Sequence, residues 1–162
     1  MVQEKFLKDL VKQVAKRLTE RQYQLVTAES CTGGLIGAYC TEMAGSSRWF
    51  FGGVISYANE AKMAALNVSE ATLNTEGAVS ASTVRQMCAG ALVLGGNVAV
   101  AVSGVAGPSG GSLEKPVGCV YIAWQVKGQK VIVERCQFEG TRRAIRREAL
   151  ARALEGILEA TE

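Results

Sequence analysis

The chain has 162 residues, of which 48% are hydrophobic and 20% are charged, and its net charge is +3. This is the composition of an ordinary globular protein that is long enough to bury a core, and so mild a charge does not by itself indicate nucleic acid. No apolar run is long enough to cross a membrane, and the charged N-terminus has no signal-peptide core, so a cytoplasmic protein is expected.

Two residue counts limit the possible chemistry. The chain contains no histidine, which excludes Ser–His–Asp and Cys–His catalytic groups and the commonest zinc sites. An enzyme of this sequence that uses a nucleophile would therefore need lysine, tyrosine or a carboxylate as its base. The five cysteines are odd in number and include no C-x-x-C pair, which argues against a disulfide framework.

Hydrophobic periodicity and turn residues divide the chain into helices and strands. Helices are expected over residues 5–20, 32–43, 60–66, 69–74 and 81–94, followed by a last helix. The expected N-caps of the last four helices are Asn59, Ser69, Ser80 and Thr141. Strands are expected over residues 24–28, 51–57, 97–103, 117–126 and 131–138, the last two forming a hairpin. Helices before, between and after about five strands predict one domain over residues 1–162, a three-layer α/β/α fold with a mixed sheet.

A strand-to-helix turn with the sequence AESCTGG occupies residues 28–34. Such a turn can present free amides to an oxyanion or a phosphate, here those of Cys31, Thr32, Gly33 and Gly34. Ser30 is a candidate nucleophile, although serine is also typical of a helix N-cap. Cys31 is a rival, because a helix N-terminus lowers the pKa of a thiol, and its alternative is a packed small side chain.

A lysine stands in the first turn of the helix expected over residues 60–66. The helix dipole disfavours a positive charge there, so Lys62 is a candidate for a neutral amine that acts as a general base. A solvated surface lysine is the alternative. Tyr57, at the end of the preceding strand, could stabilise the proton or could be an ordinary interface aromatic. Ser47, in the loop before that strand, is a second candidate nucleophile or a turn hydroxyl.

Two further segments are typical of anion binding. The glycine-rich loop over residues 103–111 follows a buried-type strand, where α/β sheets bind ligands; a flexible surface loop is the alternative. Four arginines crowd the start of the last helix against its dipole, and a bound anion would resolve that conflict; they are Arg142, Arg143, Arg146 and Arg147. A solvated basic face remains open, and the lack of interleaved aromatic residues disfavours nucleic acid.

Five motifs in order resemble the CinA C-terminal domain family, whose stand-alone members include nicotinamide-nucleotide amidases. They read AESCTGG, AGSSRWF, YANEAK, SGVAGPSGG and EKPVG. The resemblance extends from about Leu7 to the last helix. It implies hydrolysis of the carboxamide of nicotinamide mononucleotide (NMN), giving nicotinate mononucleotide and ammonia. It also implies a serine–lysine mechanism without metal or other cofactor, and a homo-oligomer.

The resemblance further implies which residues form the site. Its catalytic set comprises Ser30, Ser47, Tyr57 and Lys62. The nucleotide contacts would come from the 30–34 turn and from Ser103, Gly104, Ala106, Gly107, Arg142 and Arg146. One position departs from the family, which has Gly-Asp-Arg where this chain has Gly140-Thr141-Arg142. That departure leaves open another nucleotide substrate, or a catalytically weak or inactive nucleotide-binding paralogue.

Overall fold

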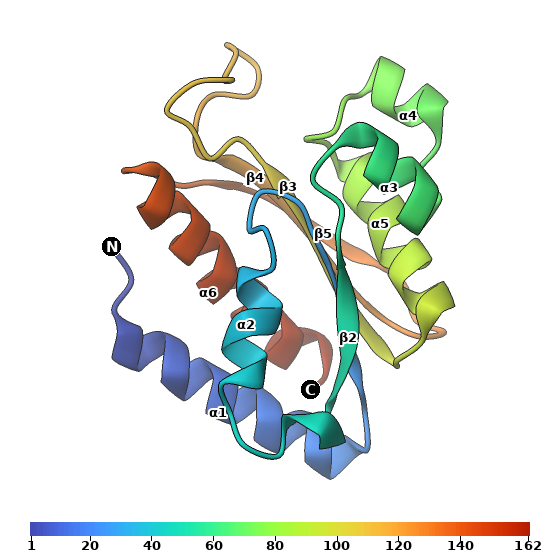
Figure 1. Ribbon diagram of the computed structural model, residues 1–162, viewed down its shortest axis with the longest axis vertical. Helices are drawn as coiled ribbons and strands as arrows, with labels where there is room; N and C mark the ends of the chain where they lie inside the picture. Colours follow the sequence, from blue (N-terminus) through green and yellow to red (C-terminus); the bar gives the residue numbers. More distant parts are fainter.

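A computed structural model describes residues 1–162 (Figure 1). Its helices are α1 (Glu4–Arg21), α2 (Leu35–Thr41), the short 3₁₀ helix η1 (Ser46–Arg48), α3 (Asn59–Leu66), α4 (Glu70–Thr75), α5 (Ala81–Leu94) and α6 (Arg142–Ala160). Its strands are β1 (Leu25–Glu29), β2 (Phe50–Ile55), β3 (Val98–Gly104), β4 (Cys119–Val126) and β5 (Ile132–Gln137). The number of strands and the order of helices and strands along the chain are as predicted.

The five strands form one mixed sheet in the order β2-β1-β3-β4-β5. Strands β2, β1 and β3 are parallel, whereas β4 and β5 add as an antiparallel hairpin. The parallel pairs are joined by helical crossovers, as parallel strands require. The carboxyl ends of β1, β2 and β3 therefore meet at one edge of the sheet, which is where ligands bind in open α/β sheets.

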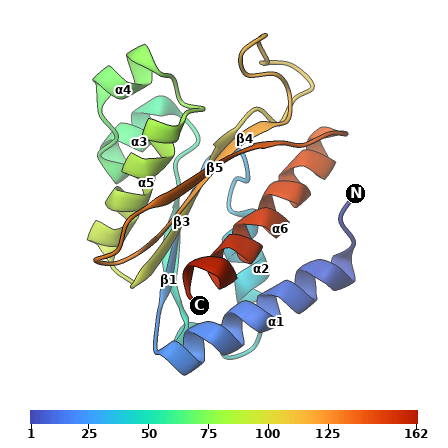
Figure 2. The same ribbon diagram turned by 180° about the vertical axis from the view of Figure 1, so that it is seen from behind.

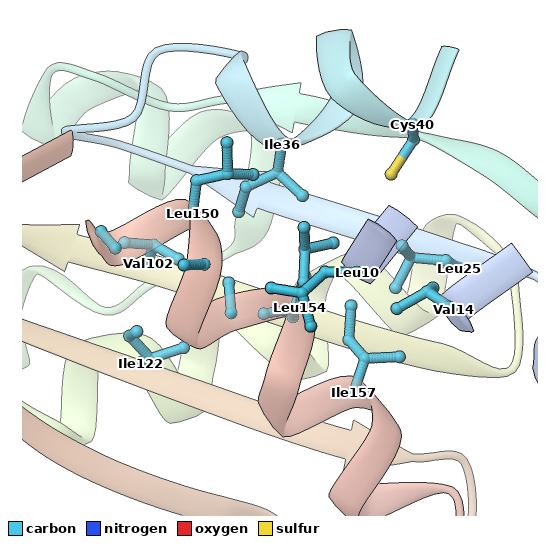
Figure 3. Packing of buried hydrophobic residues seen from close by; sticks show 14 of the residues in the cluster. Leu10, Val14, Leu25, Ile36, Cys40, Val102, Ile122, Leu150, Leu154 and Ile157 are labelled. Atoms are coloured by element: carbon cyan, nitrogen blue, oxygen red, sulfur yellow. The ribbon is translucent and has the colours of Figure 1, made fainter. Parts of the chain in front are cut away.

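Helices cover both faces of the sheet, so the predicted three-layer arrangement is confirmed (Figures 1 and 2). Helices α1, α2 and α6 pack on one face, and Figure 3 shows their apolar side chains meeting those of the sheet. Helices α3, α4 and α5 pack on the other face through a smaller apolar cluster. Every residue of β1 is buried, so the end of this strand, which Ser30 follows, is anchored in the middle of the molecule.

Three of the four predicted helix caps are confirmed; the fourth, Asn59, is wrong, because α3 begins at Asn59 and its N-cap is Ala58. The start of α2 is also corrected. Ser69, Ser80 and Thr141 each accept a hydrogen bond from the backbone amide three residues later. Helix α2 begins at Leu35 rather than at residue 32. Gly33 and Gly34 adopt positive φ angles of 60° and 100°, which lie outside the helical region. None of the helices is sufficiently long and apolar to span a membrane.

Candidate active site

The turn from Ser30 to Gly34 lies at the carboxyl edge of the sheet. The amide of Ser30 donates to the carbonyl of Val102 on β3, at 3.0 Å, so Ser30 continues the register of β1. The alternative role of Ser30, as the N-cap of α2, is wrong: Gly34 takes the N-cap position, and the amides of the first turn are bonded by Glu29. Its carboxylate accepts from the amides of Ile36 and Gly37 at 2.9 and 3.0 Å. The Ser30 hydroxyl is thereby left for other contacts.

Lys62, on the helix that follows β2, contacts Ser30. Its Nζ is 2.9 Å from the Ser30 Oγ and donates to the carbonyls of Ser56 and Tyr57 at 2.9 and 3.0 Å. The side chain is 1% exposed, so Lys62 is not a solvated surface lysine. Burial lowers the pKa of the Lys62 ammonium from its usual value, because desolvation disfavours the charged form.

Cys31 is placed beside this pair, but its thiol is poorly suited to attack. Burial raises the pKa of the Cys31 thiol to about 11, so it stays protonated at neutral pH. The expectation that a helix N-terminus would lower this pKa is wrong, because α2 begins four residues later. Desolvation then outweighs the nearby positive charges.

Tyr57 and Arg142 close one side of the site. The Tyr57 hydroxyl accepts from Arg142 Nη2 at 3.0 Å, and Arg142 Nη1 donates to the carbonyl of Gly107 at 2.7 Å. These bonds join the end of β2, the glycine-rich loop and the start of α6. Neither acceptor carries a negative charge, and no carboxylate forms an ion pair with Arg142. Its positive charge is therefore uncompensated.

A cavity of about 170 Å³ lies where these elements meet. It is lined by Ser30, Cys31, Tyr57, Lys62, Ala78, Val79, Ser103, Gly104, Ala106 and Arg142. Most of these residues were singled out in the sequence. Ala78 and Val79 were not, since two apolar residues in a loop before a helix carry no chemical signal. The Ser103 hydroxyl donates to the Ala78 carbonyl at 2.8 Å, which ties that loop to β3.

The glycine-rich loop contributes to the site mainly through its first residues. Gly104 and Ala106 line the cavity, while Gly107 does not line it and accepts a hydrogen bond from Arg142 through its carbonyl. Gly107 has a φ of 78°, which favours glycine. The chain then extends away from the sheet before it returns to β4 (Figure 1), and the side chain of Leu113 in this segment is fully exposed.

The four arginines of α6 have separate contacts rather than a common one. Only Arg142 lines the cavity. Arg146 donates to the carbonyls of Cys31 and Thr32 at 3.1 and 2.8 Å. Arg147 forms an ion pair with Glu4 of α1 at 2.9 Å. Arg143 is exposed.

Ser47 lies at the opposite end of β2 from Lys62. It is an exposed residue of η1, which precedes β2, whereas Ser56 and Tyr57 follow that strand. The six residues of β2 span about 20 Å, at roughly 3.3 Å per residue. Of the two serines that the sequence left open, only Ser30 is brought to Lys62 within one chain.

The chain is similar to known proteins over nearly its whole length. The family model of the CinA C-terminal domain matches residues 7–161. A protein of Enterobacter agglomerans named nicotinamide-nucleotide amidohydrolase PncC is 45% identical over 156 residues, which cover 96% of this chain and 95% of that one. The protein of the same name from Escherichia coli K12 is 46% identical over 152 residues, covering 93% and 92%.

Solved structures agree with this match. The crystal structure of the competence/damage inducible protein CihA from Agrobacterium tumefaciens superposes with a TM-score of 0.95 at 40% identity. It covers 97% of this chain and 96% of that one. The family match over nearly the whole sequence, together with these full-length relatives, shows that the chain belongs to the CinA C-terminal domain family.

Proposed function

We propose that this protein is an amidase that hydrolyses the carboxamide of NMN to nicotinate mononucleotide and ammonia. The amidohydrolases named above act on a nicotinamide nucleotide and match nearly the whole chain. The observation that carries a serine–lysine mechanism is the 2.9 Å contact between Lys62 Nζ and Ser30 Oγ beside the cavity. We propose that the whole unit, residues 1–162, is one such amidase domain.

The contacts of Lys62 favour transfer of a proton from serine to lysine. Backbone carbonyls can only accept hydrogen bonds, so the carbonyls of Ser56 and Tyr57 each require one N–H of the amine. A neutral amine has two N–H bonds and one lone pair, and that lone pair then faces the Ser30 hydroxyl. Burial favours the neutral form by lowering the pKa of Lys62. The pair is therefore arranged as nucleophile and base.

The reaction follows in two stages. Ser30 Oγ attacks the carboxamide carbon while its proton passes to Lys62 Nζ, which gives a tetrahedral oxyanion. When the C–N bond breaks, the Lys62 ammonium returns the proton to the leaving amine, and ammonia departs from an acyl-serine ester. Water then attacks the ester while Lys62 takes one of its protons, and Lys62 passes that proton to Ser30 Oγ as the C–O bond breaks. The product leaves as the carboxylic acid, which ionises to nicotinate by releasing its proton to solvent.

Size and charge of the site are consistent with a nucleotide substrate. A cavity of about 170 Å³ is smaller than the ~300–1,000 Å³ of a typical ligand pocket, and it suits a single aromatic ring with its carboxamide. The ribose and phosphate would then lie outside, along the glycine-rich loop and the start of α6. The uncompensated guanidinium of Arg142 lies on that path, and arginine matches phosphate geometry.

One observation favours an alternative, a nucleotide-binding paralogue with little or no turnover. Thr141 stands where the family motif has aspartate, and its hydroxyl caps α6 by accepting from Ala144 N at 3.1 Å. The cap is therefore satisfied without the acid, and a role of that acid in substrate binding would be lost. If the missing acid makes the native chain weak or inactive, Thr141→Asp should raise the rate of ammonia release. If the native chain is already fully active, the substitution should not raise that rate.

The test is a product assay with the purified chain, Ser30→Ala and Ser47→Ala. We expect the native protein to release ammonia and nicotinate mononucleotide from NMN in equal amounts. Ser30→Ala should abolish turnover, whereas Ser47→Ala should keep it, because Ser47 lies at the far end of β2. NMN binding by calorimetry without any product would support the alternative. Loss of activity in Ser47→Ala alone would overturn the assignment of Ser30 as nucleophile.

A further inference from the structure

Arg146 does not have the free guanidinium of an arginine that binds phosphate. Its Nε donates to the carbonyl of Cys31 at 3.1 Å, and its Nη2 donates to the carbonyl of Thr32 at 2.8 Å. These two nitrogens form the bidentate edge with which arginine grips planar acceptors. That edge is occupied by the turn that follows Ser30, and Arg146 does not line the cavity.

The peptide that Arg146 holds carries a free donor on its other side. In a trans peptide the N–H points opposite to the C=O, so holding the Cys31 carbonyl directs the Thr32 amide away from Arg146. That amide has no acceptor within the protein, although Thr32 is 0% exposed. Buried amides are nearly always paired, which indicates that the missing acceptor is brought by a ligand.

Several neighbouring amides already have acceptors within the protein. The Gly33 amide donates to the Ser30 carbonyl at 2.9 Å, and the amides of Ile36 and Gly37 donate to Glu29. The amides of Cys31, Thr32 and Gly34 are left without an acceptor, and of these only the Thr32 amide belongs to a peptide whose carbonyl Arg146 holds. That peptide borders the cavity through Cys31. In acyl transfer, a backbone amide so close to the nucleophile stabilises the oxyanion.

We propose that Arg146 is a positioning residue, which orients the Cys31–Thr32 peptide so that the Thr32 amide receives the carboxamide oxygen of the substrate. This inference rests on the proposed amidase function, and it replaces the expected contact between Arg146 and the nucleotide. The guanidinium also polarises the peptide that it grips, because it draws electron density toward the Cys31 carbonyl and strengthens the opposite N–H as a donor.

The kinetic test uses Arg146→Gln, with Arg143→Gln as its matched control. Both residues lie on α6 and carry the same charge, but Arg143 is exposed and makes no side-chain hydrogen bond. Loss of one oxyanion donor lowers kcat by ~10²–10³, so we expect a fall of about 10² in kcat for Arg146→Gln, with KM within about threefold of native. Arg143→Gln should match the native kcat. A rise in KM at constant kcat would instead make Arg146 a phosphate ligand and overturn the proposal.

A second measurement does not depend on turnover. Nicotinate mononucleotide, the proposed product, should shift the amide resonance of Thr32 in the native chain, because its carboxylate can accept that bond. Arg146→Gln should bind the same probe within threefold of the native Kd and lose the Thr32 shift. A native chain with this shift but no turnover would refute the amidase and retain the role of Arg146. An unchanged Thr32 shift in the variant, or no shift in the native chain, would refute that role.

Discussion

Replacing Lys62 by methionine tests the base most directly, since methionine keeps much of the length of the side chain and removes its nitrogen. The structure gives the site no substitute, because none of the other residues that line the cavity is a carboxylate or a second lysine. General-base catalysis contributes ~10²–10⁴ in rate. Both stages use the same amine, so we expect kcat to fall by at least ~10³, or about 4 kcal/mol at ~1.4 kcal/mol per factor of ten.

The assay is the initial rate of ammonia release from NMN, with Lys16→Met as the control. The Lys16 side chain is 78% exposed and lies on α1, on the opposite side of the sheet from α3. Circular dichroism and thermal melting should show that both variants are folded. If Lys62→Met keeps more than about a tenth of the native kcat, the contact of Lys62 with Ser30 is not a base–nucleophile contact and the mechanism must be abandoned.

Three further outcomes are expected. The rate should rise with pH as Lys62 loses its proton, with a midpoint below its usual pKa of 10.5. Because the unfolded lysine binds the proton more tightly, the free energy of unfolding should rise with pH from that midpoint up to the usual pKa, and neither rise should occur in Lys62→Met. Cys31→Ala should keep kcat within about threefold of native, because the pKa of the buried thiol is about 11; a hundredfold loss would restore Cys31 as the nucleophile. Gly156→Ala should lower the free energy of unfolding in urea by about 1–3 kcal/mol, because an added Cβ would overlap the ring of Trp124; an unchanged midpoint would contradict the close packing of α6 on β4.

Most of the fold was predictable because its signals are local. Ser69, Ser80 and Thr141 act as caps within three residues of their own positions, and a polar oxygen before a helix needs no distant partner to favour that role. The hairpin of β4 and β5 is likewise set by its intervening turn. The valine-rich strand before the glycine-rich loop was expected to be buried, and β3 is buried along nearly all of its length.

The site was less predictable, because its contacts join segments far apart in sequence. Nothing near Lys62 shows that its amine meets Ser30, 32 residues earlier. The absence of histidine limited the catalytic base to a few residue types. It could not decide between Ser30 and Ser47 as nucleophile, because that choice depends on Ser47 lying at the far end of β2. Arg146 was expected to contact the nucleotide like its neighbour Arg142. Composition cannot show that its guanidinium instead donates to two carbonyls of the turn that follows Ser30.

A lysine base must satisfy two demands that oppose each other. The amine must be buried to lose its proton readily, yet a buried polar group without partners is destabilising. Here the backbone meets both demands: the carbonyls of Ser56 and Tyr57, where the chain leaves β2, accept from Lys62 and carry no charge that would hold its proton as a carboxylate would. Since these acceptors belong to the main chain, the direction of the lone pair depends on the path from β2 into α3. Changes that lengthen this connection should therefore abolish turnover even where Ser30 and Lys62 are both retained.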